Sequence, residues 1–147
     1  FRYTMQDRTI LKVADEIQFV ESYIYLMKIR YNDGLHVHIK HDGLYTDNYI
    51  IPFGLQILVE NAIKHNRLSV HQPLHIHVFR EGNHIVVKND LCPVSSDLSS
   101  TGIGQRNIIE RYFLLCEEKP VIKKSEHSYI VKLPIIPDDY AHPDHRR

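Results

Sequence analysis

Hydrophobic positions in the first third of the chain change from a helical to a strand-like spacing. Apolar residues at three- and four-residue steps predict an amphipathic helix from Asp15 to Tyr31: Ile17, Val20, Ile24, Met27 and Tyr31. The turn-forming segment Asn32-Asp33-Gly34 ends this helix. Strict alternation of apolar and polar residues then predicts a strand over Leu35–His41. A turn at Asp42-Gly43 and a polar connection to Asn48 follow.

A second helix is predicted from Phe53 to about Asn66. Pro52 stands where a helix can start, because its missing N–H is not needed there. The apolar residues of this segment form one helical face: Leu55, Leu58, Val59, Ala62 and Ile63. Asn61, Lys64 and His65 lie on another face, at i, i+3 and i+4.

The rest of the chain reads as two hairpins separated by a loop and a helix. Leu74–Arg80 and His84–Asn89 alternate around the turn Glu81-Gly82-Asn83. Residues 91–100 are Ser-rich without periodicity and read as a loop. A helix is predicted over residues 102–116. The last hairpin joins residues 120–124 to residues 128–134, with its turn near Glu126-His127.

This order of elements predicts an α/β fold. After the first helix the chain runs strand, helix, two strands, helix, two strands, which is typical of a two-layer α/β sandwich with helices on one face of a mixed sheet. The helix before residue 34 stands apart because it precedes the sandwich. The 147 residues fit a single domain of ordinary size.

Composition excludes several classes of protein. With 18 basic and 18 acidic residues the net charge is zero, which argues against a nucleic-acid-binding protein. Cys92 and Cys116 form no CxxC pair and are interpreted as free thiols in a reducing compartment. No apolar run reaches the length of a membrane span. The start at Phe1 indicates a fragment of a longer protein, in which any membrane segment would lie elsewhere.

The eleven histidines raise the question of a metal site. Several alternate with apolar residues, as in Leu35-His36-Val37-His38 and Leu74-His75-Ile76-His77, so they fall on the polar face of predicted strands. No HExxH motif or Cys/His cluster with metal-ligand spacing occurs. Solvated strand faces are therefore the favoured interpretation.

Two segments could carry phosphoryl-transfer chemistry, which depends mainly on positioning and charge neutralisation. Asn61 could supply a carboxamide oxygen to Mg²⁺, Glu60 could orient a metal-bound water or the attacking group, and Lys64 could neutralise a phosphate. Gly102 and Gly104 could present backbone N–H groups to an anion. From the spacing alone, the favoured interpretations are the polar flank of an amphipathic helix for the first segment and an ordinary helix-entry turn for the second.

Both segments also resemble motifs of one protein family. Ile51 to His65, with the core Val59-Glu60-Asn61-Ala62-Ile63-Lys64-His65, resembles the N box of LytS-like sensor histidine kinases, which belong to the GHKL ATPases. Residues 101–112, beginning Thr101-Gly102-Ile103-Gly104, resemble the G2 box and the following helix. Residues 14–31 resemble the second helix of the dimerisation hairpin of the family. The resemblance extends to about Ile136.

The resemblance implies a Bergerat fold that binds ATP with Mg²⁺ between the N-box helix and a lid. Asn61 matches the magnesium ligand and Glu60 the adjacent acid, while Lys64 and His65 match the basic end of the box. The lid would be the loop 91–100. After this loop, Thr101, Gly102 and Gly104 match the residues that contact the nucleotide in the family. The implied domains are a hairpin remnant (1–33), a catalytic domain (34–137) and a polar tail (138–147).

Two departures from the family pattern stand out. Asn89 occupies the place of the adenine-binding Asp in the G1 box, and Leu91 replaces a glycine. Asn89 can accept a hydrogen bond but carries no charge, whereas the neighbouring Asp90 should point to the opposite face of a strand. None of the histidines lies in the Asn-Pro-His-Phe-type context of the phosphoacceptor, so this chain is not expected to autophosphorylate alone.

The sequence therefore predicts the catalytic domain of a two-component protein-histidine kinase. The expected partners are ATP, a response regulator and, in the full-length protein, a second copy. The expected location is the cytoplasmic portion of a bacterial inner-membrane sensor. A non-catalytic docking module with a degenerate nucleotide site remains the alternative, followed by another GHKL ATPase such as a protein-serine kinase. The apolar stripe of the first helix would pack on the sandwich or on another copy.

Overall fold

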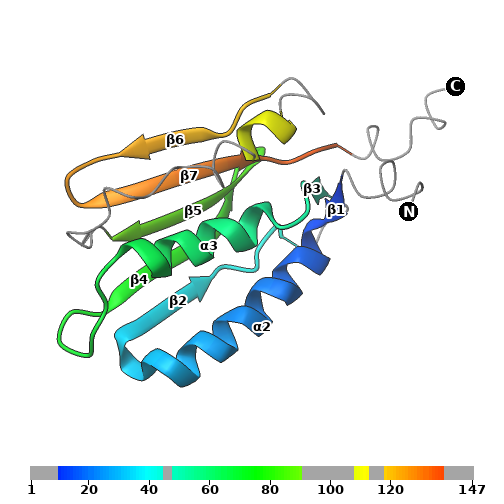
Figure 1. The fold of residues 1–147 in the computed structure, drawn as a ribbon. Helices are drawn as coiled ribbons and strands as arrows, with labels where there is room; N and C mark the ends of the chain where they lie inside the picture. The colour runs from blue at the N-terminus through cyan, green and yellow to red at the C-terminus, as the bar shows by residue number, and fades with distance from the viewer. Residues whose placement is uncertain (1–9, 45–47, 91–107, 113–117, 138–147) are drawn as a thin grey trace, which may run out of the picture.

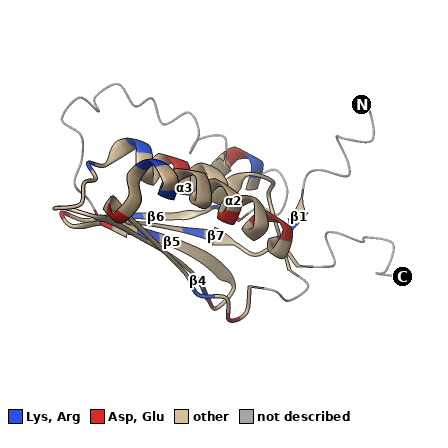
Figure 2. Cartoon of the chain, turned by 90° about the horizontal axis from the view of Figure 1, so that it is seen from below, with Lys and Arg blue, Asp and Glu red and all other residues tan. Residues whose placement is uncertain are grey.

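The computed structural model is a two-layer α/β sandwich with two long helices on one face of a five-stranded sheet (Figures 1 and 2). It describes residues 10–44, 48–90, 108–112 and 118–137. The named elements are β1 (Leu11–Lys12), α2 (Val13–Tyr31), the short 3₁₀ helix η1 (Asn32–Gly34), β2 (Leu35–Ile39), β3 (Tyr49–Ile50), α3 (Gly54–His65), β4 (Leu74–Glu81), β5 (His84–Asp90), β6 (Val121–Lys124) and β7 (Ser128–Pro134). Residues 108–112 are also helical.

The main sheet is mixed, with the strand order β2-β4-β5-β7-β6. β2 is parallel to β4, and α3 lies between them in the sequence as the crossover that a parallel pair needs. All other neighbours are antiparallel. β6 forms one end of the sheet, and all four of its residues are exposed. The predicted fold class, a mixed sheet with helices on one face, is confirmed.

The hairpin turns follow from local sequence. β4 and β5 pair up to Glu81 and His84, which leaves Gly82 and Asn83 as the loop. Gly82 has a φ of 59°, a conformation that glycine adopts without strain because it has no Cβ atom. At the end of α2, Asn32 has a φ of 49°, as the predicted stop signal requires.

The core lies between the two helices and the inner face of the sheet. α2 contributes Val13, Ile17 and Val20, all essentially buried, and it packs directly against α3 and β2. The first helix therefore does not stand apart from the sandwich. Of the two alternatives for its apolar stripe, packing on the sandwich is the one observed. The core begins upstream of residue 34, where a domain boundary was expected.

Two short strands were not predicted. β1 and β3 form a separate antiparallel pair in which Leu11 lies opposite Ile50 and Lys12 lies opposite Tyr49. Two residues are too few to produce a visible alternation, so the sequence showed only a polar connection before the second helix. The predicted strand over residues 35–41 ends earlier, at Ile39. The predicted helix over residues 102–116 lies within the described part of the chain only at residues 108–112.

Candidate functional site

α3 carries four of the predicted site residues on its last turns. Glu60, Asn61 and His65 are partly buried and Lys64 is exposed, while the opposite face of the helix is packed on the core. A helix C-terminus carries partial negative charge and repels anions. Lys64 and His65 stand in that last turn, and the ammonium group of Lys64 supplies compensating positive charge. This charge favours a phosphate group at the end of the helix.

Glu60 lies on the side of α3 that faces α2. Its Oε1 accepts a hydrogen bond of 3.0 Å from Nε2 of Gln56, one turn earlier. The pKa of Tyr23, a residue of α2, is raised by burial and then by the nearby Glu60 carboxylate. At 3.6 residues per turn, Glu60 points about 100° away from Asn61. The two adjacent residues therefore face different surroundings.

β5 separates the two candidates for base recognition. Asn89 is 3% exposed and lies on the inner face of the sheet, against which α3 packs. Its Nδ2 donates to the backbone oxygen of Asp90 at 2.7 Å. Asp90 is exposed and, by strand alternation, points to the outer face. Of the two, Asn89 is thus the residue on the same side of the sheet as α3.

The remaining predicted residues cannot be placed. Thr101, Gly102 and Gly104, together with the loop 91–100, lie outside the residues that the structure describes. The described part of the predicted site therefore consists of the end of α3 and Asn89 on the neighbouring strand.

The start of α3 makes a contact with α2 that was not predicted from the sequence. No side chain of its own caps this helix, whose N-cap residue Phe53 has a φ of 64°. Instead, the carboxylate of Glu16, from α2, accepts three backbone hydrogen bonds. Phe53 N–H donates to Oε1 at 3.0 Å, and the N–H groups of Leu55 and Gln56 donate to Oε2 at 3.1 and 3.3 Å. Glu16 is fully buried.

A signal for this contact was present in the sequence. Val13, Glu16, Ile17 and Val20 follow a helical spacing, so a carboxylate stands inside the apolar stripe of α2. α3, in turn, begins without Ser, Thr, Asp or Asn at its N-cap, the residue types that normally accept the first N–H groups. An uncapped helix and an acid on an apolar face are complementary features, but they are 37 residues apart in the sequence.

The outer face of the sheet carries a row of histidines. His36 and His38 of β2 lie directly beside His75 and His77 of β4, and the paired rings stack with centroids 4.9 and 4.8 Å apart. Stacked, nearly parallel rings do not direct their nitrogens to a common point. Among the described residues, no group of three or more His, Cys, Asp or Glu side chains is arranged to hold a metal ion.

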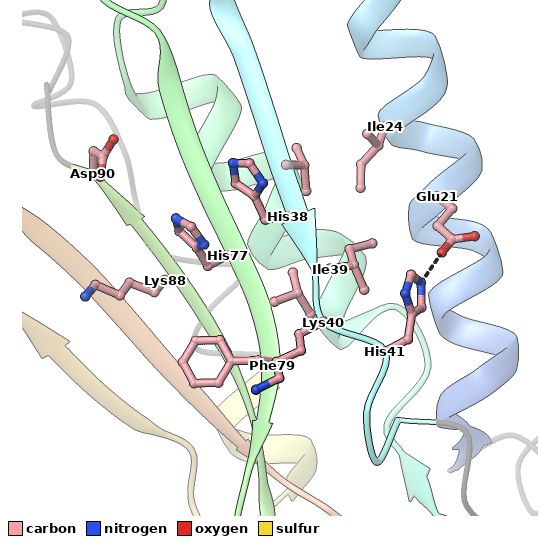
Figure 3. A pocket seen from close by; sticks show the side chains of 12 residues that line it. Glu21, Ile24, His38, Ile39, Lys40, His41, His77, Phe79, Lys88 and Asp90 are labelled. Carbon is pink, nitrogen blue, oxygen red and sulfur yellow. Dashed lines mark hydrogen bonds and ion pairs between the residues drawn. The ribbon is translucent and has the colours of Figure 1, made fainter.

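A surface hollow lies beside the edge strand β2 (Figure 3). Side chains from β2, β4, β5 and α2 line it, among them His38, His77, Lys88 and Asp90. At its rim, His41 and Glu21 interact at 3.0 Å, which ties the end of β2 to α2. Neither Asn61 nor Asn89 lines this hollow. Of the described residues predicted for the nucleotide site, Asp90 alone lines the hollow, so the hollow is separate from Asn61 and Asn89.

Sequence comparison relates the chain to staphylococcal sensor proteins. The sensor protein LytS of Staphylococcus saprophyticus is 40% identical over 67 residues, which cover 44% of this chain and 11% of LytS. LytS of Staphylococcus epidermidis is 34% identical over 93 residues, which cover 63% of this chain and 15% of the relative. The chain is thus similar in sequence to part of these LytS sensor proteins. It spans less than a fifth of the length of these relatives. No family model matches it.

Solved structures support the same relationship at the level of the fold. The cytoplasmic segment of histidine kinase QseC superposes with a TM-score of 0.59 at 13% identity, covering 85% of this chain and 75% of that one. The catalytic domain of histidine kinase ThkA superposes with a TM-score of 0.54 at 17% identity, covering 87% and 97%. The sandwich is therefore the fold of histidine kinase catalytic domains. In the described part of this chain, no helix has both the length and the apolar composition needed to cross a membrane.

Proposed function

We propose that this chain is the ATP-binding catalytic domain of a two-component sensor histidine kinase. The observation that carries the proposal is the position of two polar residues on packed elements of the kinase fold. Asn61 is partly buried at the end of α3, and Asn89 is buried on β5, against which α3 packs. Asn89 lies between the helical layer and the sheet, and Asn61 lies on the partly buried side of α3, beside the face that packs on the core.

The side chains present suit Mg²⁺ and a nucleotide. Magnesium takes oxygen ligands and keeps several waters, so one carboxamide oxygen from Asn61 is a sufficient protein ligand. When bound, the ion would neutralise charge on the phosphates. Lys64 would contact a phosphate, His65 would add positive charge and Glu60 would orient the attacking group. Asn89 would accept a hydrogen bond from the base, with Asp90 as a less favourable alternative because it points away.

The complete reaction requires groups beyond the described residues. Thr101, Gly102 and Gly104 would contact the phosphates from the lid. The γ-phosphoryl group would pass to a histidine outside this chain and then to a response-regulator aspartate, in a homodimeric protein held at a membrane by other segments. This chain would form the cytoplasmic portion.

Titration with Mg-ATP tests the site by calorimetry. We expect wild-type protein to bind and Asn61→Ala to lose most of the affinity, because the metal ligand is removed. Asn83→Ala, which makes the same change in an exposed hairpin turn, is the matched control. Absence of binding at millimolar Mg-ATP, or equal binding by Asn61→Ala, contradicts the assignment.

A second function is favoured by one observation. The Asn89 amide donates to its own neighbouring backbone, and the charge that the family places there is missing. A docking module that signals by conformation would keep the fold and lose the chemistry. Formation of phosphohistidine in the full-length protein excludes that alternative, whereas a full-length protein that binds Mg-ATP without forming phosphohistidine supports it.

A further inference from the structure

The end of α3 opposite to Asn61 is held by a residue of another helix. Three backbone N–H groups at the start of α3 donate to the two carboxylate oxygens of Glu16, at 3.0 to 3.3 Å. An ionised carboxylate only accepts hydrogen bonds and therefore matches three donors. α3 has no acidic residue in its own first turn, so Glu16 also provides the negative charge that the positive end of a helix favours.

The surroundings of Glu16 indicate a role beyond stability. Burial raises the pKa of its carboxyl group, while the hydrogen bonds from Phe53, Gln56 and Leu55 and the charge of Arg111 act in the opposite direction. Burial thus opposes the ionised form of Glu16, which the three N–H groups favour. A charge that burial opposes is better explained by the geometry that it imposes on its partners.

That geometry extends along the helix. α3 rises about 1.5 Å per residue as a rigid rod, so Asn61 and Lys64 lie only about 10 to 15 Å from the first turn. A displacement of the first turn along the axis of α3 would also move these two residues relative to Asn89 on β5. Arg111, whose charge acts on Glu16, lies in the helical residues 108–112 and so connects a third part of the chain to the same carboxylate.

We propose that Glu16 is a positioning residue of the nucleotide site. It fixes α3 to α2 and so holds Asn61 and Lys64 in the position in which they bind Mg-ATP. This inference rests on the proposed function. It implies that α2 controls nucleotide affinity. A shift of α2 that withdraws the carboxylate from Phe53, Leu55 and Gln56 weakens nucleotide binding, although Glu16 itself does not contact the nucleotide.

Glu16→Gln is the principal variant. Gln has the same shape, but its Nε2 is a donor and would oppose one of the three N–H groups. Val20→Ala is the matched control, because Val20 is equally buried on α2, one turn away, and its truncation destabilises the core without altering the cap. Mg-ATP titrations are made at a temperature where both variants are folded. We expect Glu16→Gln to lose affinity by about fivefold or more, the scale of a typical coupling between two sites, and Val20→Ala to remain within twofold of wild type.

Hydrogen exchange on wild-type protein provides a test that requires no variant. Coupling between two sites is reciprocal, so Mg-ATP should slow the exchange of the Phe53, Leu55 and Gln56 amide protons relative to amides of the β4–β5 turn. Wild-type binding combined with unchanged affinity in Glu16→Gln, or with unchanged exchange of these three amides, overturns the positioning role alone. Absence of wild-type Mg-ATP binding instead contradicts the proposed function and, with it, this inference.

Discussion

Two adjacent residues of β5, Asn89 and Asp90, are the candidates for base recognition in the predicted site. Strand alternation places Asn89 on the helix-covered face of the sheet and Asp90 on the open face. The sequence analysis could anticipate this separation, because adjacent residues of a strand always point to opposite faces. It could not anticipate that the Asn89 amide donates to the backbone oxygen of Asp90, since that contact depends on a rotamer.

Replacing Asn89 by Asp should restore a charged acceptor. Hydrogen bonds to charged groups are stronger than neutral ones by about 1 kcal/mol, so the preference for ATP over GTP should rise about fivefold. Calorimetric titration with both nucleotides measures the ratio. Asp90→Asn is the control and should leave the ratio unchanged, because its side chain points to the other face. An unchanged ratio in Asn89→Asp would show that Asn89 does not contact the base.

Gly54 is required by packing at the first position of α3. A Cβ atom there would lie 2.9 Å from Cγ1 of Ile51. Overpacking costs about 1 to 3 kcal/mol, which exceeds the gain of about 1 kcal/mol from helix propensity. Gly54→Ala should therefore lower the urea midpoint. In the double variant with Ile51→Ala the alanine at position 54 should cost nothing further. A higher midpoint for Gly54→Ala alone would contradict the steric explanation.

At the scale of elements, the helices and strands long enough to show a periodic pattern of apolar residues were predicted from the sequence. The helices α2 and α3 and the hairpins β4–β5 and β6–β7 were all recognised from apolar spacing and turn residues. β1 and β3 were not predicted, because two residues are too few to show an alternating pattern. The cap from Glu16 to α3 escaped because it joins segments 37 to 40 residues apart, and no local pattern records a tertiary hydrogen bond.

His38 of β2, which stacks on histidines of β4, should make folding stability depend on pH. The pKa of His38 is lowered by burial and then by His77, His75, His36 and Lys28. As the pH falls below the ordinary value of about 6.5, the unfolded chain therefore takes up the proton first, and folding stability declines.

Urea unfolding at pH 7.5 and pH 5.5 measures this effect. The fall in midpoint on acidification should be smaller in His38→Gln than in wild type, because the neutral amide has no proton to gain. His71→Gln changes an exposed histidine outside the row and should keep the wild-type fall. Equal falls in all three proteins would show that the stacked rings do not affect stability.

At the scale of the whole molecule, α2 is part of one continuous core. Val13, Ile17 and Val20 are buried together with residues of α3 and of the sheet. The proposal that residues 1–33 derive from a dimerisation hairpin therefore concerns the origin of the segment, and the packing of α2 predicts that this helix is needed for folding. The sequence could not show this, because an apolar stripe does not identify the surface that covers it.

A chain that begins at residue 34 should fail to fold. It would expose the inner surface covered by α2 and leave the three N–H groups at the start of α3 without their acceptor. Circular dichroism and dispersed amide NMR signals test this, with a chain beginning at residue 10 as the folded control. A cooperative, native-like domain from residues 34–137 would instead support an independent hairpin.

The outermost strand has a consequence for solubility. β6 presents Val121 and Ile122 at the edge of the sheet, each more than a third exposed, and a bare strand edge can recruit strands of other molecules into fibrils. Lys123 and Lys124 follow directly, and their like charges oppose such stacking. Replacing both lysines by uncharged residues should therefore increase amyloid-type self-assembly of the protein.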